Sequence, residues 1–300
     1  MKRWLAVTVL IIIAGAAIFY AERRKPEGHV GPEAVLNAVA ETQRDLSRVP
    51  AQLTRLSDEE EIEIGNAMAA RYAASTHSGW EEETDAPVEK YINVVGRIVA
   101  ARAHRKLDYR FHYIPDSSFL NAFSLPGGHI FIGKGFLLQM DTEDELANIL
   151  GHEVEHVDHY HCAEKIQLET RLRNLPLAEL LQLPVELFQA GYGKEQELEA
   201  DREGTHLAVM AGYSSQGALH MFEKFERLDR QYVQKAESPD EELSQVAIQT
   251  IIGYFRSHPL PQERARQIRN LIASEKWPQR AERPLRVHLD SPKTSPAQGN

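Results

Sequence analysis

Cysteine is almost absent from this chain of 300 residues, since Cys162 is the only one. A single cysteine excludes an intrachain disulfide and is compatible with an oxidising compartment without requiring one. Basic charge is scarce too, because 34 Lys and Arg stand against 44 Asp and Glu, for a net charge of −10. That balance argues against a nucleic-acid partner, which needs a concentrated basic face.

Long apolar runs are lacking beyond residue 21. The leucine-rich stretch 175–191 contains Pro176, Pro184, Glu179 and Glu186, which exclude a membrane span. It is either a lid over a site or an ordinary pair of core helices, and its apolar residues at helical spacing favour core helices.

The chain begins with a short basic segment, Met1–Arg3, and an uncharged, mostly apolar run, Trp4–Ala21, follows it. As a membrane anchor, the run is just long enough to cross the hydrocarbon. As a cleaved signal peptide, its apolar part ends earlier and Ala14-Gly15-Ala16 is the small-residue cleavage site. Residues 1–21 are therefore predicted to be a signal peptide or an N-terminal membrane anchor, and both alternatives export the rest of the chain.

The remaining chain divides into three parts. Residues 22–56 are predicted to be a polar tether and a leading helix, 57–275 the main domain, and 276–300 a disordered tail rich in proline and charge. The domain begins with a helix capped by Ser57 or Asp58, because acidic residues fill its first turn. Further helices are predicted over 86–103, 195–212 and 216–233.

In the middle of the domain, the spacing of the apolar residues changes from helical to alternating. Residues 107–115 alternate as a half-buried strand, and strand-like runs flank the Pro126-Gly127-Gly128 turn. The second run, comprising His129, Ile130, Phe131 and Ile132, is short and bounded by glycines, which is typical of an edge strand. Thr142 and Glu145 then form a capping box that opens a central helix. The predicted fold class is α+β, mainly α.

The central helix carries "HEVEH", residues 152–156. His152 and His156 are four residues apart, so their rings leave one helix face and can hold one zinc ion. Glu153 lies about 100° further around the axis, where it can reach a water at the metal without binding the ion. The alternative is a solvated helix that is merely rich in His and Glu.

A hydrolytic zinc site usually has a third protein ligand. The extended motif with a third histidine is excluded unless Cys162 binds the metal, which would be unusual for a hydrolase, because His159 and Cys162 occupy its glycine and histidine positions. The other candidate is "ELEAD", where Glu197 and Asp201 share a helix face. Glu197 can bind the metal while Asp201 accepts the second ring N–H of a ligating histidine and fixes its tautomer.

Six segments occur in the order found in metallopeptidase family 48, the zinc gluzincins: "EEEIEIG", "YINVVGRI", "NAFSLPGGHIFIGKGFL", "DELANILGHEVEH", "ELEADREG…AGY" and "HPLPQER". From about Ser57 to Ile272 the chain resembles this family, which includes HtpX and Oma-like proteins. With an N-terminal signal or anchor and no further span, it is most similar to the periplasmic BepA/LoiP branch. The resemblance implies a gluzincin fold, with a small sheet whose edge strand lines the cleft and an active-site helix.

The resemblance implies two further features. The strand His129–Ile132 would pair with an extended substrate through main-chain hydrogen bonds. His258 would cover the zinc or act in the transition state, although a lone loop histidine is more often structural. Two residues depart from the family pattern: Glu155 stands where a small residue is common, and His159 is an additional histidine.

The sequence therefore predicts a zinc endopeptidase with one Zn²⁺ per chain, in which Glu153 transfers protons. His258, Tyr254, Arg202 and Asn121 are unranked candidates for stabilising the oxyanion. The predicted partners are unfolded or misassembled envelope polypeptides, and the predicted location is the periplasm or the outer face of the inner membrane. The rivals are a zinc-containing chaperone or assembly factor and a helical interaction protein without metal.

Overall fold

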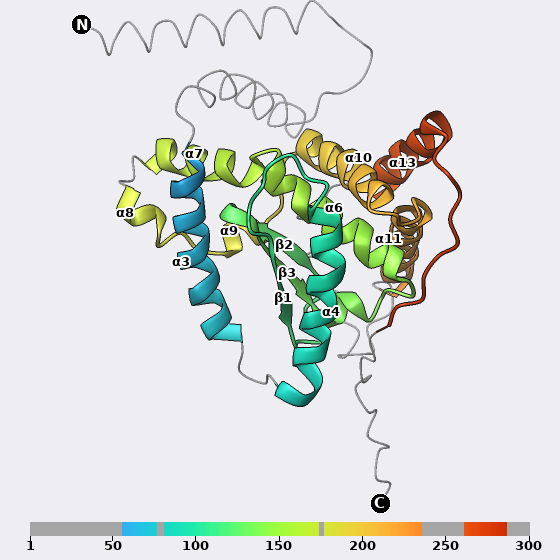
Figure 1. Cartoon of the computed structure of the whole chain (residues 1–300), viewed down its shortest axis with the longest axis horizontal. Helices are drawn as coiled ribbons and strands as arrows, with labels where there is room; N and C mark the ends of the chain where they lie inside the picture. Colours follow the sequence, from blue (N-terminus) through green and yellow to red (C-terminus); the bar gives the residue numbers. More distant parts are fainter. Residues whose placement is uncertain (1–55, 77–80, 174–176, 236–260, 287–300) are drawn as a thin grey trace, which may run out of the picture. The chain divides into compact units, whose positions relative to one another are not determined.

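The structure is a computed structural model that describes residues 56–76, 81–173, 177–235 and 261–286 (Figure 1). Helices dominate and surround one small sheet, so the predicted α+β, mainly α class is confirmed. The elements are α3 (Asp58–Thr76), α4 (Glu82–Ala100), β1 (Arg110–Ile114), β2 (Ala122–Leu125), η1 (Pro126–Gly128), β3 (His129–Gly133), α5 (Lys134–Leu137), α6 (Glu143–Asp158), α7 (His161–Arg173), α8 (Leu177–Leu180), α9 (Glu186–Gln189), α10 (Lys194–Met210), α11 (Gln216–Lys235) and α13 (Pro261–Glu275).

The three described strands are ordered β1-β3-β2. β3 pairs in parallel with β1, with Arg110 opposite His129, and antiparallel with β2, with Ala122 opposite Ile132. The predicted edge strand His129–Ile132 is therefore the central strand, and that prediction is wrong. The physical reason is burial: all five residues of β3 are buried. Gly127 lies in the turn that precedes β3, and its φ of 74° is a conformation that glycine adopts without strain.

The capping box that opens α6 is confirmed. Thr142 Oγ1 accepts the Glu145 N–H at 3.2 Å, and Glu145 Oε2 accepts the Thr142 N–H at 3.1 Å. All 16 residues of α6 are buried, although more than half of them are polar or charged. A buried polar helix requires partners for its side chains, so its neighbours must supply hydrogen bonds and opposite charge.

Glycine sets how closely α6 and α10 approach. A Cβ on Gly151 of α6 would lie 2.5 Å from the Gly204 carbonyl oxygen, and a Cβ on Gly204 would lie 2.5 Å from the His152 nitrogen. Real Cβ atoms do not come so close, so the two backbones touch only because both residues lack a side chain. This contact brings the polar faces of the two helices together (Figure 1).

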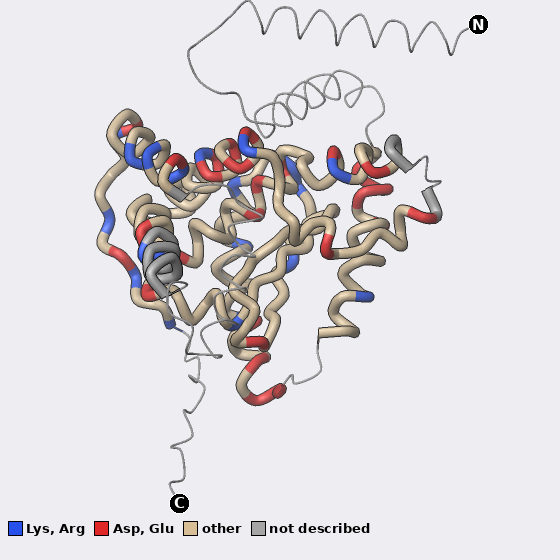
Figure 2. Tube along the Cα trace, turned by 180° about the vertical axis from the view of Figure 1, so that it is seen from behind, with Lys and Arg blue, Asp and Glu red and all other residues tan. Residues whose placement is uncertain are grey.

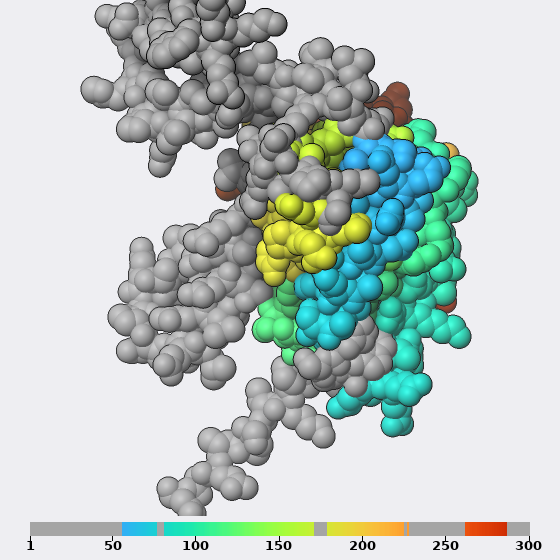
Figure 3. Space-filling model, turned by 90° about the vertical axis from the view of Figure 1, so that its left-hand side faces the viewer, coloured from blue at the N-terminus to red at the C-terminus, as the bar shows by residue number. Residues whose placement is uncertain are grey.

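The leucine-rich stretch is part of the core rather than a lid. Leu180, Leu183 and Phe188 are buried, as predicted for core helices. Figure 3 shows this segment in yellow against α3 in blue. Hydrogen bonds join them: Arg71 donates through Nη1 to the Leu181 carbonyl and through Nη2 to the Leu183 carbonyl, the latter at 3.0 Å. Gln189 Nε2 donates to the Tyr72 hydroxyl at 2.9 Å.

The predicted disordered tail is wrong for residues 276–286, which dock against the start of α6. The Glu143 N–H donates to the Arg283 carbonyl at 2.8 Å, and the Arg283 N–H donates to Asp144 Oδ2 at 2.6 Å. Arg280 Nη1 donates to the Val209 carbonyl at 2.9 Å. The charged side chains that suggested disorder here bind backbone carbonyls near the end of α10 instead, since Arg283 Nη2 also donates to the Gly212 carbonyl. Residues 287–300 lie outside the described residues.

Within the described ranges, none of the helices combines the length and apolar character of a membrane span. The apolar run Trp4–Ala21 and the predicted tether 22–55 lie outside these ranges, so both N-terminal predictions stay predictions.

Candidate metal centre

Three buried donor side chains converge between α6 and α10. His152 Nε2 and His156 Nε2 are 3.1 Å apart. Glu197 closes the triangle from α10, with Oε2 3.4 Å from His152 Nε2 and Oε1 3.7 Å from His156 Nε2. Their exposed fractions are 4%, 0% and 0%. The structure therefore brings together the three residues that the sequence singled out from two segments about 40 positions apart.

This donor set fits a zinc ion. Tetrahedral zinc bonds of about 2.0–2.1 Å place donor atoms roughly 3.3 Å apart, which is close to the three separations above. Two imidazoles and one carboxylate are the donor types of a hydrolytic zinc site, which keeps one position for water. The two ring nitrogens, of His152 and His156, face each other and the Glu197 carboxylate. Such an arrangement needs a shared cation or proton.

Electrostatics favour a positive charge at this point. Burial alone lowers the pKa of His152, but hydrogen bonds and charges from Asp201 and Glu197 outweigh it and raise the pKa to about 10. The same negative field would favour a metal cation between these groups. Zinc and a proton therefore compete for the site.

A chain of contacts orients the His152 ring. Its Nδ1 lies 2.9 Å from Asp201 Oδ1, so Nδ1–H donates and Nε2 is left to face the donor cluster. Arg264 on α13 binds Asp201: its Nε and Nη2 each donate to one of the two carboxylate oxygens at 2.6 Å. Burial raises the pKa of Asp201, but Arg264 and His152 outweigh it and hold that pKa below its usual value.

A second chain orients the His156 ring. Nδ1 of His156 lies 2.9 Å from Nδ1 of His161, whose Nε2 lies 3.3 Å from Glu199 Oε2. Tyr192 stacks on the His156 ring with centroids 4.0 Å apart, and its backbone N–H donates to Glu197 Oε1 at 3.1 Å. One residue thus supports both an imidazole and the carboxylate.

Arg264, His161, Glu199 and Tyr192 were not assigned these roles from the sequence. Arg264 lies in the "HPLPQER" segment and His161 follows the "HEVEH" motif by five residues, so each had a local signal. Their partners are 63 and 38 positions away, and a local pattern does not specify such contacts.

The other predicted residues occupy different surroundings. Glu153 is buried beside His152, with an exposed fraction of 2%. Cys162 contacts the Tyr192 hydroxyl at 3.1 Å, and burial raises its pKa to about 12, so it is a neutral thiol outside the donor cluster. Arg202 pairs with Glu203 at 2.7 Å on the exposed face of α10, and Asn121 precedes β2. His258 and Tyr254 lie outside the described residues.

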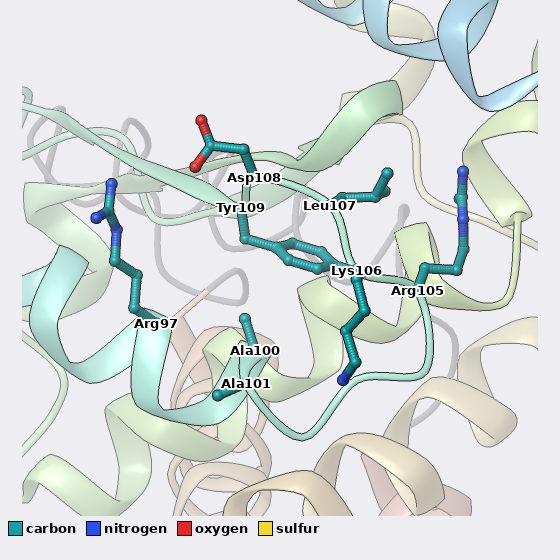
Figure 4. Close-up of a pocket in the computed structure, with 8 residues that line it drawn as sticks. All are labelled: Arg97, Ala100, Ala101, Arg105, Lys106, Leu107, Asp108 and Tyr109. Atoms are coloured by element: carbon teal, nitrogen blue, oxygen red, sulfur yellow. The ribbon is translucent and has the colours of Figure 1, made fainter.

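Acidic and basic residues are interspersed along the described part of the chain (Figure 2). One surface cavity, at the end of α4, is lined by Arg97, Lys106, Asp108 and Tyr109 and lies apart from the donor cluster (Figure 4).

Comparison with known proteins identifies the family. The profile of peptidase family M48 matches residues 86–272, which include all three donor residues. The chain belongs to peptidase family M48. This membership confirms the resemblance drawn from the motifs and makes the chain a metallopeptidase.

Individual M48 relatives match at modest identity. The beta-barrel assembly-enhancing protease of Yersinia pestis is 27% identical over 235 residues, covering 72% of this chain and 44% of the relative. The mitochondrial metalloendopeptidase OMA1 of Schizosaccharomyces pombe is 31% identical over 156 residues, covering 48% of this chain and 46% of the relative. The matched region is thus less than half the length of each relative.

Proposed function

We propose that this M48 chain is a zinc-dependent endopeptidase that cleaves extended, unfolded polypeptides. The observation that carries the proposal is the convergence of His152, His156 and Glu197, all buried, at mutual distances that suit one zinc ion. A zinc ion held by these side chains would polarise the scissile carbonyl and make a water molecule more acidic.

Glu153 acts as the proton carrier. Its carboxylate takes a proton from the attacking water and delivers it to the leaving amine, which is the role of a general base that becomes a general acid. Asp201 and Arg264 hold His152, and His161 and Glu199 hold His156, so the two rings keep one tautomer and one orientation. Preorganisation of this kind reduces the rearrangement needed during the reaction.

The substrate would be an extended chain that adds to an edge of the sheet. Among the described strands, β1 and β2 form the edges, and β2 packs against α6. Pairing through the main chain tolerates many side chains and suits unfolded or misassembled envelope proteins. The proposed location is the periplasm or the outer face of the inner membrane, with the N-terminal segment as signal or anchor.

A second candidate is an assembly factor on the same fold with little proteolysis. The name of the Yersinia pestis relative, a beta-barrel assembly-enhancing protease, favours this alternative. The two candidates differ in whether Glu153 is required.

The test is Glu153→Gln, which removes the base and retains the size of the side chain. Zinc content and casein cleavage are measured for wild type, this variant and Glu59→Gln, a matched change on the exposed face of α3. We expect Glu153→Gln to bind one zinc and to lose cleavage by at least a hundredfold, since general acid–base catalysis contributes about 10²–10⁴-fold. Retained cleavage would overturn the peptidase assignment, whereas an inactive wild type that still suppresses aggregation would favour the assembly factor.

A further inference from the structure

A second group of donor side chains lies at the C-terminal end of α6, apart from the first. Glu155, Asp158 and His159 each offer a ligand atom within 4.8 Å of the others. Glu155 and His159 are the two residues at which the chain departs from the common family pattern, and the fold places them in contact. His159 Nδ1 lies 2.5 Å from Glu155 Oε2.

Asp158 is held in place by the segment between α4 and β1. Its Oδ1 accepts the Arg105 N–H at 2.6 Å, and its Oδ2 accepts the His104 N–H at 2.9 Å. The His104 ring supplies a fourth candidate metal ligand, because its Nδ1 lies 3.0 Å from the same Oδ2. A carboxylate fixed by two backbone groups is already positioned for a ligand.

Among the described residues, the buried Glu155 carboxylate has a hydrogen-bond partner at one of its two oxygens and none at the other. Its side chain is only 1% exposed, and Oε1 has no hydrogen-bond partner among the described residues. Oε2 of Glu155 faces the His159 ring, while Asp158 faces the His104 ring. The neighbouring Arg105 guanidinium is occupied by Asp58 and Glu61. A buried oxygen without a partner is costly unless a cation or a water completes it.

The group is open to solvent on one side. The His104 side chain is 82% exposed and the His159 side chain 30% exposed. The rings of His104 and His159 lie with centroids 6.4 Å apart, on the solvent side of the two carboxylates. A cation could therefore enter without unfolding α6.

We propose that Glu155, Asp158 and His159, completed by His104, form a second divalent-cation site for zinc or a similar ion. Carboxylate oxygens with imidazole nitrogens suit zinc, cobalt(II) and manganese(II). The ion would lie beside Glu155 Oε1, which has no hydrogen-bond partner among the described residues. The site is weaker than the first, because His104 is exposed and the His159 ring must turn from its hydrogen bond.

The test measures stoichiometry rather than activity. The full chain is loaded with one equivalent of Zn²⁺ and then titrated with further Zn²⁺ by calorimetry and equilibrium dialysis. We expect wild type to take up a second equivalent, and both Glu155→Gln and His159→Gln to bind it at least tenfold more weakly. The matched control is His206→Gln, which changes an exposed histidine on α10 that contacts Trp277.

Two outcomes would overturn the second site: wild type that stops at one equivalent and loses that equivalent in Glu197→Gln, or two variants that bind the second equivalent as tightly as wild type. If Glu155→Gln does not fold, as judged by circular dichroism, His159→Gln decides alone. The Glu197→Gln variant separates this inference from the proposed function. Loss of one equivalent in Glu197→Gln supports the first site, whereas wild type with one equivalent that only Glu155→Gln removes would reject the first site and retain the second.

Discussion

Adding one methyl group at Gly204 should separate α6 from α10 and dismantle the zinc site from a distance. A Cβ built there lies 2.5 Å from the His152 nitrogen and 2.7 Å from both the Gly151 carbonyl carbon and the His152 Cα. Ordinary contacts between such atoms are about 3.5–4.0 Å, so the helices must part by roughly 1 Å. Glu197 is on α10 and both histidines are on α6, so the same shift widens the donor triangle.

For Gly204→Ala we expect zinc affinity to fall on the order of 100-fold, because a displacement of about 1 Å in a preorganised site has an effect of that size. Overpacking should also lower the free energy of unfolding by about 1–3 kcal/mol. Competition with a chromogenic chelator measures the affinity, and urea unfolding of the zinc-free protein measures the stability. Met210→Ala, on the exposed part of α10, is the control and should change neither. Gly204→Ala with zinc affinity within twofold of wild type would refute the argument that the glycine contact sets the donor distances.

Two further predictions concern buried polar groups. Arg264→Leu leaves the Asp201 carboxylate buried without its guanidinium, which should cost about 3–5 kcal/mol in urea unfolding and weaken zinc binding about 10–100-fold; unchanged zinc affinity would show that Arg264 does not support His152. His129 is buried and its pKa is lowered to about 4, mainly by burial, so below pH 6.5 the unfolded chain binds a proton that the folded chain does not. Stability should therefore fall between pH 6.5 and pH 4, by at most about 1.4 kcal/mol per pH unit from this group, and the fall should be smaller in His129→Leu; parallel pH profiles of the two proteins would contradict the assignment.

Much of the site was predictable from local patterns. The spacing of His152 and His156 and that of Glu197 and Asp201 each place two side chains on one helix face, and that property depends only on helix geometry. The capping box at Thr142 is local in the same sense and is confirmed. The proposed zinc chemistry rests on the convergence of His152, His156 and Glu197 in the fold.

The errors arose where long-range packing decides the structure. The strand His129–Ile132 lies between two partners, and a short run bounded by glycines does not reveal how many neighbours it has. Residues 276–286 look disordered by composition, but Arg280 and Arg283 bind backbone groups that other elements present. The hydrogen bonds from Arg264 to Asp201 likewise depend on the packing of α13 against α10.

The most direct test of the zinc site is an anomalous difference map from crystals of the zinc-loaded protein, recorded at the zinc absorption edge. The account predicts that the strongest peak lies within about 2.0–2.2 Å of Nε2 of His152, Nε2 of His156 and a carboxylate oxygen of Glu197. A strongest peak at Cys162, or at any position that Glu197 does not reach, would contradict it.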